Sequence, residues 1–178
     1  MDLIKLHKVK EFANEQLKKW GLTGSYGNDW CMVWDTKAVR RYGQCRYRKQ
    51  EIGITKQLAN INSIEESKDV VLHEIAHALT GPGHGHDAEW KRMCIKVGAR
   101  PERCYKSEMQ GGDVKTVSGK YKLINKETGK VYKEYHRRPK FKDWSQRWIV
   151  GKKAETEGKL QVVRSCHNKL LGQTTTIK

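Results

Sequence analysis

The chain lacks the sequence features that mark secreted and membrane proteins. Its 178 residues include five cysteines, which are scattered and form no CxxC pair. An odd number of cysteines without regular spacing argues against a disulfide framework and for reduced thiols. We therefore expect a cytoplasmic protein. The sequence also has no run of 18 apolar residues and no charged-then-apolar leader. We therefore expect neither a membrane span nor a signal peptide.

Acidic residues are scarce in the last two fifths of the chain. The whole sequence has 36 Lys and Arg against 20 Asp and Glu, a net charge of +16. Residues 1–104 carry 18 basic against 13 acidic side chains, whereas residues 105–178 carry 18 against 7. The shorter part therefore holds +11 of the excess, which predicts a polyanionic partner for it.

Two glycine-containing stretches, 109–113 and 118–119, interrupt the chain after its first hundred residues. Clusters of glycine and polar residues are typical of connections between folded segments. We therefore expect a first domain over residues 1–107, a linker over 108–119 and a small basic module over 120–178.

The basic module has the pattern of two short β-hairpins. Tyr121–Ile124 and Val131–Tyr135 flank a turn that contains glycine, over residues 125–129. Arg147–Val150 and Leu160–Arg164 flank a second connection.

The pentapeptide His73-Glu74-Ile75-Ala76-His77 carries the clearest chemical information. On a helix, residues i and i+4 share one face, so His73 and His77 can bind one metal ion at roughly 2.0–2.1 Å. Glu74 lies beside the first ligand and can reach a metal-bound water, whose pKa the metal lowers towards ~7. A carboxylate there can take the proton as the water attacks a carbonyl, which predicts a zinc hydrolase.

The flanking residues predict that this pentapeptide lies on a buried helix. Ser67 is a candidate N-cap, and Asp69 would lie in the first turn, where the helix dipole favours an anion. Thr80–Gly83 ends the helix, because proline cannot continue it. The alternative is a core helix with two incidental histidines, although buried histidines without a partner are unfavourable. The first 20 residues have the apolar spacing of another, amphipathic helix.

A catalytic zinc needs a third protein ligand and an open position. His84 and His86 follow a glycine-rich turn, and Asp87 is a candidate first residue of a second helix that runs to about Val97. His86 lies at the mouth of that helix and faces back along the first one, which favours it as the ligand. His84 is the alternative ligand, or a donor to the substrate.

The run HEIAHALTGPGHGHDAEW resembles the SprT-like zinc metalloproteases, in which HExxH is followed by a later His and, four residues on, by Trp or Phe. His86 and Trp90 match this second element. Upstream, Trp34–Tyr47 is similar to the family's pair of strands before the active-site helix, and Glu51–Thr55 to its next strand. The resemblance covers about residues 1–104.

This resemblance implies an α+β fold, with a zincin-like minimal metalloprotease domain in which helices pack on a small antiparallel sheet. It implies a peptidase that cuts unstructured or DNA-attached protein, with Glu74 as base and one catalytic Zn²⁺ held by His73, His77 and His86. Relatives often follow the protease domain with a zinc ribbon whose hairpin tips carry CxxC. Because these cysteines are missing here, we expect a ribbon-like module without metal, or an unrelated small sheet.

Aromatic and basic residues alternate over residues 132–148 of the basic module. Aromatic platforms beside cations are typical of sites that hold single-stranded nucleic acid, so we expect single-stranded or distorted DNA as a partner. The alternative for most of the rings is the core of a small module. The candidate nucleic-acid residues are Arg137, Arg138, Lys140, Lys142, Trp144, Arg147 and Trp148.

Several points stay open at the level of sequence. Tyr42, Arg41 and His84 are candidates for the second group that stabilises an oxyanion. A DNA-binding protein with a structural or idle zinc site is an alternative function, which the intact Glu74 disfavours because a structural site needs no base. A zinc peptidase without a nucleic-acid role is another. The protein substrate and the oligomeric state are not indicated.

Overall fold

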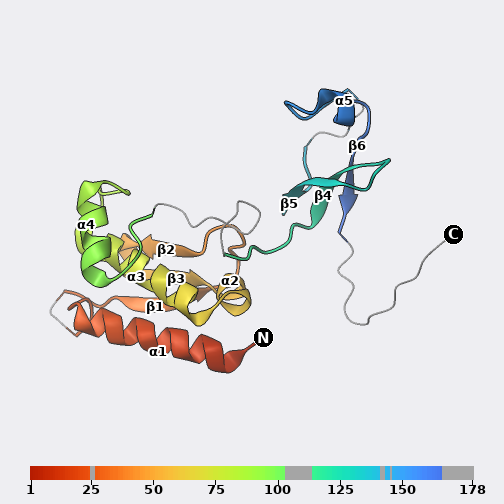
Figure 1. Cartoon of the computed structure of the whole chain (residues 1–178). Helices are drawn as coiled ribbons and strands as arrows, with labels where there is room; N and C mark the ends of the chain where they lie inside the picture. The colour runs from red at the N-terminus through yellow and green to blue at the C-terminus, as the bar shows by residue number, and fades with distance from the viewer. Residues whose placement is uncertain (25–26, 103–113, 141–142, 145, 166–178) are drawn as a thin grey trace. The chain divides into compact units, whose positions relative to one another are not determined.

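The computed structural model describes residues 1–24, 27–102, 114–140, 143–144 and 146–165. These belong to two compact units, Met1–Val117 and Ser118–Lys178 (Figure 1). None of the helices in the described ranges has the length and apolar character needed to span a bilayer. Helices and small sheets occur together, so the α+β class predicted from the sequence is confirmed.

A three-stranded sheet forms the centre of the first unit. It consists of β1 (Cys31–Asp35), β2 (Gly43–Arg46) and β3 (Glu51–Thr55), in the order β1-β3-β2. β1 is parallel to β3 and β2 is antiparallel to it. The expectation of an antiparallel sheet with β1 and β2 as a pair is therefore wrong. β3 lies between them, and a short helix, η1 (Tyr47–Lys49), connects β2 to β3.

Helices α1 (Leu3–Lys19) and α3 (Ile64–Thr80) pack beside one another, and α2 (Lys56–Ile61) precedes α3 (Figure 1). α1 is the expected amphipathic helix, because its apolar side chains recur at helical spacing and are buried. These are Leu6, Val9, Ala13 and Leu17. Their partners in the core include Ile52 and Ile54 of β3 and Val71 and Ile75 of α3, all fully buried. α3 is thus held inside the unit along most of its length.

The start of α3 lies four residues earlier than the sequence predicts. Ser63 is the N-cap, and its side chain accepts a hydrogen bond from the Glu66 N–H. Ser67, the expected cap, lies one turn inside the helix, where its hydroxyl donates to the Ser63 carbonyl. The acids of the first turn are Glu65 and Glu66 instead of Asp69. Asp69 has a different role, because it accepts hydrogen bonds from Arg100.

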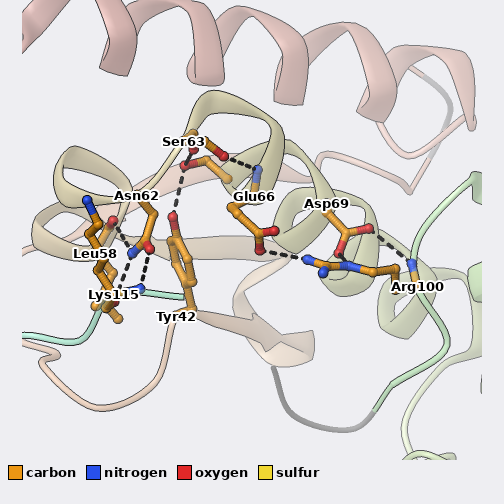
Figure 2. A network of polar contacts seen from close by, with 9 residues as sticks. Tyr42, Leu58, Asn62, Ser63, Glu66, Asp69, Arg100 and Lys115 are labelled. Carbon is orange, nitrogen blue, oxygen red and sulfur yellow. Dashed lines mark hydrogen bonds and ion pairs between the residues drawn. The ribbon is translucent and has the colours of Figure 1, made fainter. Parts of the chain in front are cut away.

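Two polar clusters fasten other segments to the first half of α3 and the residues before it (Figure 2). The Arg100 guanidinium donates to Asp69 at 2.8 Å and to Glu66 at 2.6 Å. This ties the chain that follows α4 (Ala88–Val97) to α3. The buried Asn62 side chain accepts from the Lys115 N–H and donates to the Lys115 carbonyl.

The first unit therefore extends beyond the expected boundary at residue 107. Val114 is buried in its core, Val117 packs against that core, and Lys115 is held by Asn62. These residues belong to the stretch 108–119 that the sequence assigns to a linker. Of that stretch, residues 108–113 lie outside the described residues.

The second unit contains a three-stranded antiparallel sheet, in the order β5-β4-β6. β4 (Tyr121–Asn125) and β5 (Val131–Tyr135) form the first expected hairpin. The second is not formed, because β6 (Leu160–Arg164) pairs with the free edge of β4. Arg147–Val150, its expected partner, is not a strand, and α5 (Lys153–Thr156) precedes β6.

Candidate metal centre

Three histidine side chains, two from α3 and one from the turn before α4, meet at one point in the first unit. His73 and His77 lie one turn apart on α3, and His86 precedes α4. The Nε2 atom of His86 lies 3.3 Å from that of His77 and 3.4 Å from that of His73. A ligand atom from each residue lies within 4.8 Å of the other two. The three histidines singled out in the sequence are thus together in space.

The spacing of these nitrogens fits a metal with tetrahedral geometry. Zinc–imidazole bonds of roughly 2.0–2.1 Å at tetrahedral angles place two ligand nitrogens about 3.3–3.4 Å apart. The two Nε2–Nε2 distances on His86 match this value. Three imidazoles leave one position of a tetrahedron for water or substrate, which is the arrangement of catalytic rather than structural zinc sites.

Trp90 packs against all three histidines of the cluster. Its ring is fully buried, and the ring centroids of His73, His77 and His86 lie 4.7, 5.1 and 4.5 Å from it. The His77 ring stacks on it at an interplanar angle of 25°. Because this large ring touches all three imidazoles, it restricts their rotation and holds the nitrogens facing one another.

The turn between α3 and α4 explains why His86 joins the cluster and His84 does not. Gly81 and Gly83 have φ of +84° and +106°, which glycine adopts without strain. Asp87 caps α4 through the Trp90 N–H, and its other oxygen lies 2.8 Å from Nδ1 of His84. The His84 side chain is therefore held at the helix start, while its backbone forms a hydrogen bond with the His77 ring. A backbone partner of this kind orients a metal-binding imidazole.

Burial keeps His73 and His77 neutral. Desolvation, and then the neighbouring His77 and His86, lower the pKa of His73 to about 3. Desolvation, together with His86, lowers the pKa of His77 to about 4. Both rings are therefore unprotonated at neutral pH, and a neutral imidazole has the lone pair that a metal ion requires.

Glu74, the next residue after His73 on α3, is buried, with only 6% of its surface exposed. Burial raises its pKa to about 8, against the opposing effects of a backbone hydrogen bond from Cys45 and the positive charge of Arg41. A divalent cation on the adjacent imidazoles would lower this pKa, because an opposite charge nearby favours the carboxylate. The side chain thus has the adjustable proton affinity that a general base needs.

The three candidates for a second oxyanion stabiliser have other contacts. The Tyr42 hydroxyl lies 3.0 Å from the Ser67 hydroxyl, which is on the first half of α3. Arg41 forms an ion pair with Asp35 at 2.8 Å, and His84 is held by Asp87. Their proposed role stays a prediction.

Tyr47 is a residue near the site that sequence reasoning missed. Its hydroxyl donates to the backbone carbonyl of His77 at 3.2 Å and thereby connects η1 to the end of the histidine-bearing helix. Tyr47 is the last residue of the expected strand region Trp34–Tyr47, and nothing in the local sequence indicates which carbonyl its hydroxyl reaches.

The candidate nucleic-acid residues lie on the stretch between β5 and α5, outside the strands. Arg137, Arg138, Lys140 and Arg147 are exposed, and Lys142 lies outside the described residues. Trp148 is 47% exposed, with the Lys153 ammonium 4.5 Å from its ring centroid. Trp144 is half-buried, and its indole nitrogen is buried. Trp148 is therefore the more accessible of the two tryptophan rings.

The chain was compared with known families, curated proteins and solved structures. No curated protein matches the sequence. One similar solved structure is the crystal structure of the metallopeptidase zymogen of Pyrococcus abyssi abylysin. It is 17% identical, with a TM-score of 0.40, over 50% of this chain and 78% of that one. Residues 10–110, which include the three histidines and Glu74, match the SprT-like family, and the chain belongs to that family.

Proposed function

We propose that this protein is a zinc-dependent endopeptidase that acts on protein associated with or crosslinked to DNA. Membership of the SprT-like family supports a metallopeptidase in general. The observation that carries the proposal is the meeting of three imidazoles at tetrahedral spacing, with the buried Glu74 next to His73 on the same helix. A structural zinc site has no need of such a carboxyl.

In the proposed reaction, His73, His77 and His86 would hold the zinc ion. The metal would lower the pKa of a water molecule and polarise the substrate carbonyl. Glu74 would take the proton from this water as it attacks the peptide carbonyl, and would then transfer that proton to the leaving amine. Trp90 keeps the imidazoles in place, and the burial of Glu74 keeps bulk water away from its carboxyl.

The charge of the second unit supports a nucleic-acid partner. Ser118–Lys178 carries 16 Lys and Arg against five Asp and Glu, a net charge of +11. The stretch after β5 has exposed arginines and lysines as well as the accessible ring of Trp148. Cationic side chains together with an accessible aromatic ring are typical of sites that bind single-stranded DNA. A substrate held on DNA would then be presented to the peptidase by the same chain.

Glu74→Gln tests the peptidase mechanism. Glutamine keeps the size of the side chain but cannot accept the proton, so zinc content should be unchanged while proteolysis falls by roughly 10²–10⁴-fold. Zinc is measured by elemental analysis, and cleavage is measured on casein and histones with and without single-stranded DNA. Glu65→Gln is the matched control, because Glu65 is an exposed acid on the same helix.

Each alternative function predicts a different result. A DNA-binding protein with an idle zinc site would bind zinc and DNA, and the parent protein would cleave neither substrate. A peptidase without a nucleic-acid role would cleave both substrates, and DNA would leave the rate unchanged. Equal cleavage by the parent and Glu74→Gln would show that Glu74 is not the base.

A further inference from the structure

Strand β2 and Tyr47, which follows it at the start of η1, lie directly against the histidine-bearing helix α3. Gly43 and Cys45 are alternate residues of β2, and Tyr47 begins η1; each of the three contacts α3. The Cys45 backbone forms a hydrogen bond with the Glu74 carboxyl, and the Tyr47 hydroxyl donates to the His77 carbonyl. One short segment therefore contacts both the candidate base and a candidate ligand residue.

At Gly43 the backbone lies so close to α3 that any side chain there would force its neighbours to shift. A Cβ atom at position 43 would lie 2.4 Å from Oε1 and 2.7 Å from Cγ of Glu74, and 2.8 Å from Cγ1 of Val70. All three distances are shorter than non-bonded carbon and oxygen atoms tolerate. The backbone conformation of Gly43 is not in the left-handed region, so the requirement for glycine comes from this space alone.

Either Glu74 or β2 would have to move to make room for a side chain at position 43. Glu74 is buried, and β2 is fixed to β3 by its ladder from Gly43↔Ile54 to Arg46↔Glu51. The Glu74 carboxyl can shift most easily, because it lies at the end of a side chain with several rotatable bonds. A shift would also break its hydrogen bond with the Cys45 backbone.

We propose that Gly43 is a positioning residue for the Glu74 carboxylate, whose place against β2 depends on the absence of a side chain at position 43. The proposal rests on the proposed function of Glu74 as the base. The bare backbone at Gly43 leaves the space, and the Cys45 N–H two residues on holds the carboxylate in it. Position 43 thus controls the distance between the base and the water that it deprotonates, without touching substrate.

Gly43→Ala separates positioning from folding and from metal binding. The added methyl should displace the carboxylate, and a displacement of about 1 Å is enough to slow a reaction on the order of 10²-fold. We expect kcat on a peptide substrate to fall by that order, while KM and zinc content stay at the parent values. Gly53→Ala is the matched control, because Gly53 lies in the same sheet and its added Cβ would meet mainly the flexible end of Arg46, at 3.3 Å.

A second variant distinguishes Glu74 from Val70 as the residue that matters. Val70→Ala removes the Cγ1 atom that the new methyl would meet, but it leaves the overlap with Glu74. In the double variant Gly43→Ala/Val70→Ala, kcat should therefore stay low. Recovery of kcat in this double variant, or parent-like kcat in Gly43→Ala itself, would overturn the proposal.

Thermal unfolding tests the same contact without any need for activity. Gly43→Ala should lower the Tm of the parent, and much of this loss should disappear in a Glu74→Ala background, because alanine lacks both overlapping atoms. An equal loss in the two backgrounds would refute the contact. If the parent binds zinc but cleaves no substrate, the proposed function fails, while this comparison of Tm values still decides whether Gly43 positions Glu74.

Discussion

At the scale of single residues, the choice between two nearby histidines depends on one aspartate. His84 and His86 are separated by a single glycine, and either could face the end of α3 by sequence alone. Asp87 holds the His84 ring at the start of α4 and caps that helix with its other oxygen. The His86 ring is left to contact Trp90 and to complete the cluster.

Replacing each of these histidines by alanine tests the assignment. His86→Ala should weaken zinc binding by more than the ~10–100-fold that follows the loss of a group that only orients a ligand. His84→Ala should have a much smaller effect, because it keeps the backbone group that bonds to the His77 ring. Competition with a zinc chelator measures both affinities, and the reverse order would assign the site to His84.

At the scale of elements, the loop between β1 and β2 is held by a single carboxylate. Oδ1 of Asp35 accepts the Lys37 and Ala38 N–H groups, and Oδ2 accepts from Arg41 and Arg46. The hydrogen bond from the Ala38 backbone, together with Arg41 and Lys37, lowers the pKa of Asp35 to about 2 against an opposing effect of burial. This loop leads directly into Gly43 and the strand beside Glu74.

Asp35→Asn should therefore destabilise the protein in a pH-dependent manner. The carboxylate is favoured in the folded state, so its contribution is complete above the ordinary Asp pKa of 3.8 and is lost as pH falls through about 2. Asparagine keeps one oxygen for the backbone donors but loses the charge that faces two arginines. Urea unfolding at pH 7 should show a loss of roughly 1.5–3 kcal/mol, the usual strength of hydrogen bonds to charged groups.

The difference between the parent and Asp35→Asn should shrink between pH 4 and pH 2. Asp29→Asn is the matched control, since Asp29 is an exposed acid just before β1. A difference that stays constant down to pH 2 would mean that the charge of Asp35 does not stabilise the fold.

At the scale of the whole molecule, charge is divided unequally between the two units. Met1–Val117 carries a net charge of +5 and Ser118–Lys178 one of +11, although the second unit is about half as long. The candidate metal centre lies wholly in the first unit. Catalysis and nucleic-acid binding can therefore be tested on separate parts of the chain.

A chain that ends at Val117 should keep the zinc site and lose most affinity for single-stranded DNA. The cut belongs after Val117 because Val114 and Val117 pack on the first unit and Lys115 is bonded to Asn62. Binding by the full chain should weaken steeply with salt, with a log–log slope of about −0.7 per phosphate contacted. Fluorescence anisotropy over a salt series measures both, and equal binding by the shortened chain would place the DNA site on the first unit.

The sequence alone was enough for those parts of the site that depend on local geometry. His73 and His77 share a face because of helical periodicity, and Asp87 starts α4 because its side chain can cap the following turn. The same local rules predicted α1 from its apolar spacing. They also predicted the β4–β5 hairpin, whose two strands are close in the chain. Even the meeting of His86 with the earlier pair followed from a short turn between two helices.

Only the tertiary structure decided which distant segments meet. The insertion of β3 between β1 and β2, and the pairing of β6 with β4, depend on sheet edges that local alternation does not identify. The space that Gly43 leaves for Glu74 and the bond from Tyr47 to His77 join residues about 30 positions apart. A glycine or tyrosine in a strand pattern carries no local mark of its contact, because the contact exists only when the sheet packs against the helix.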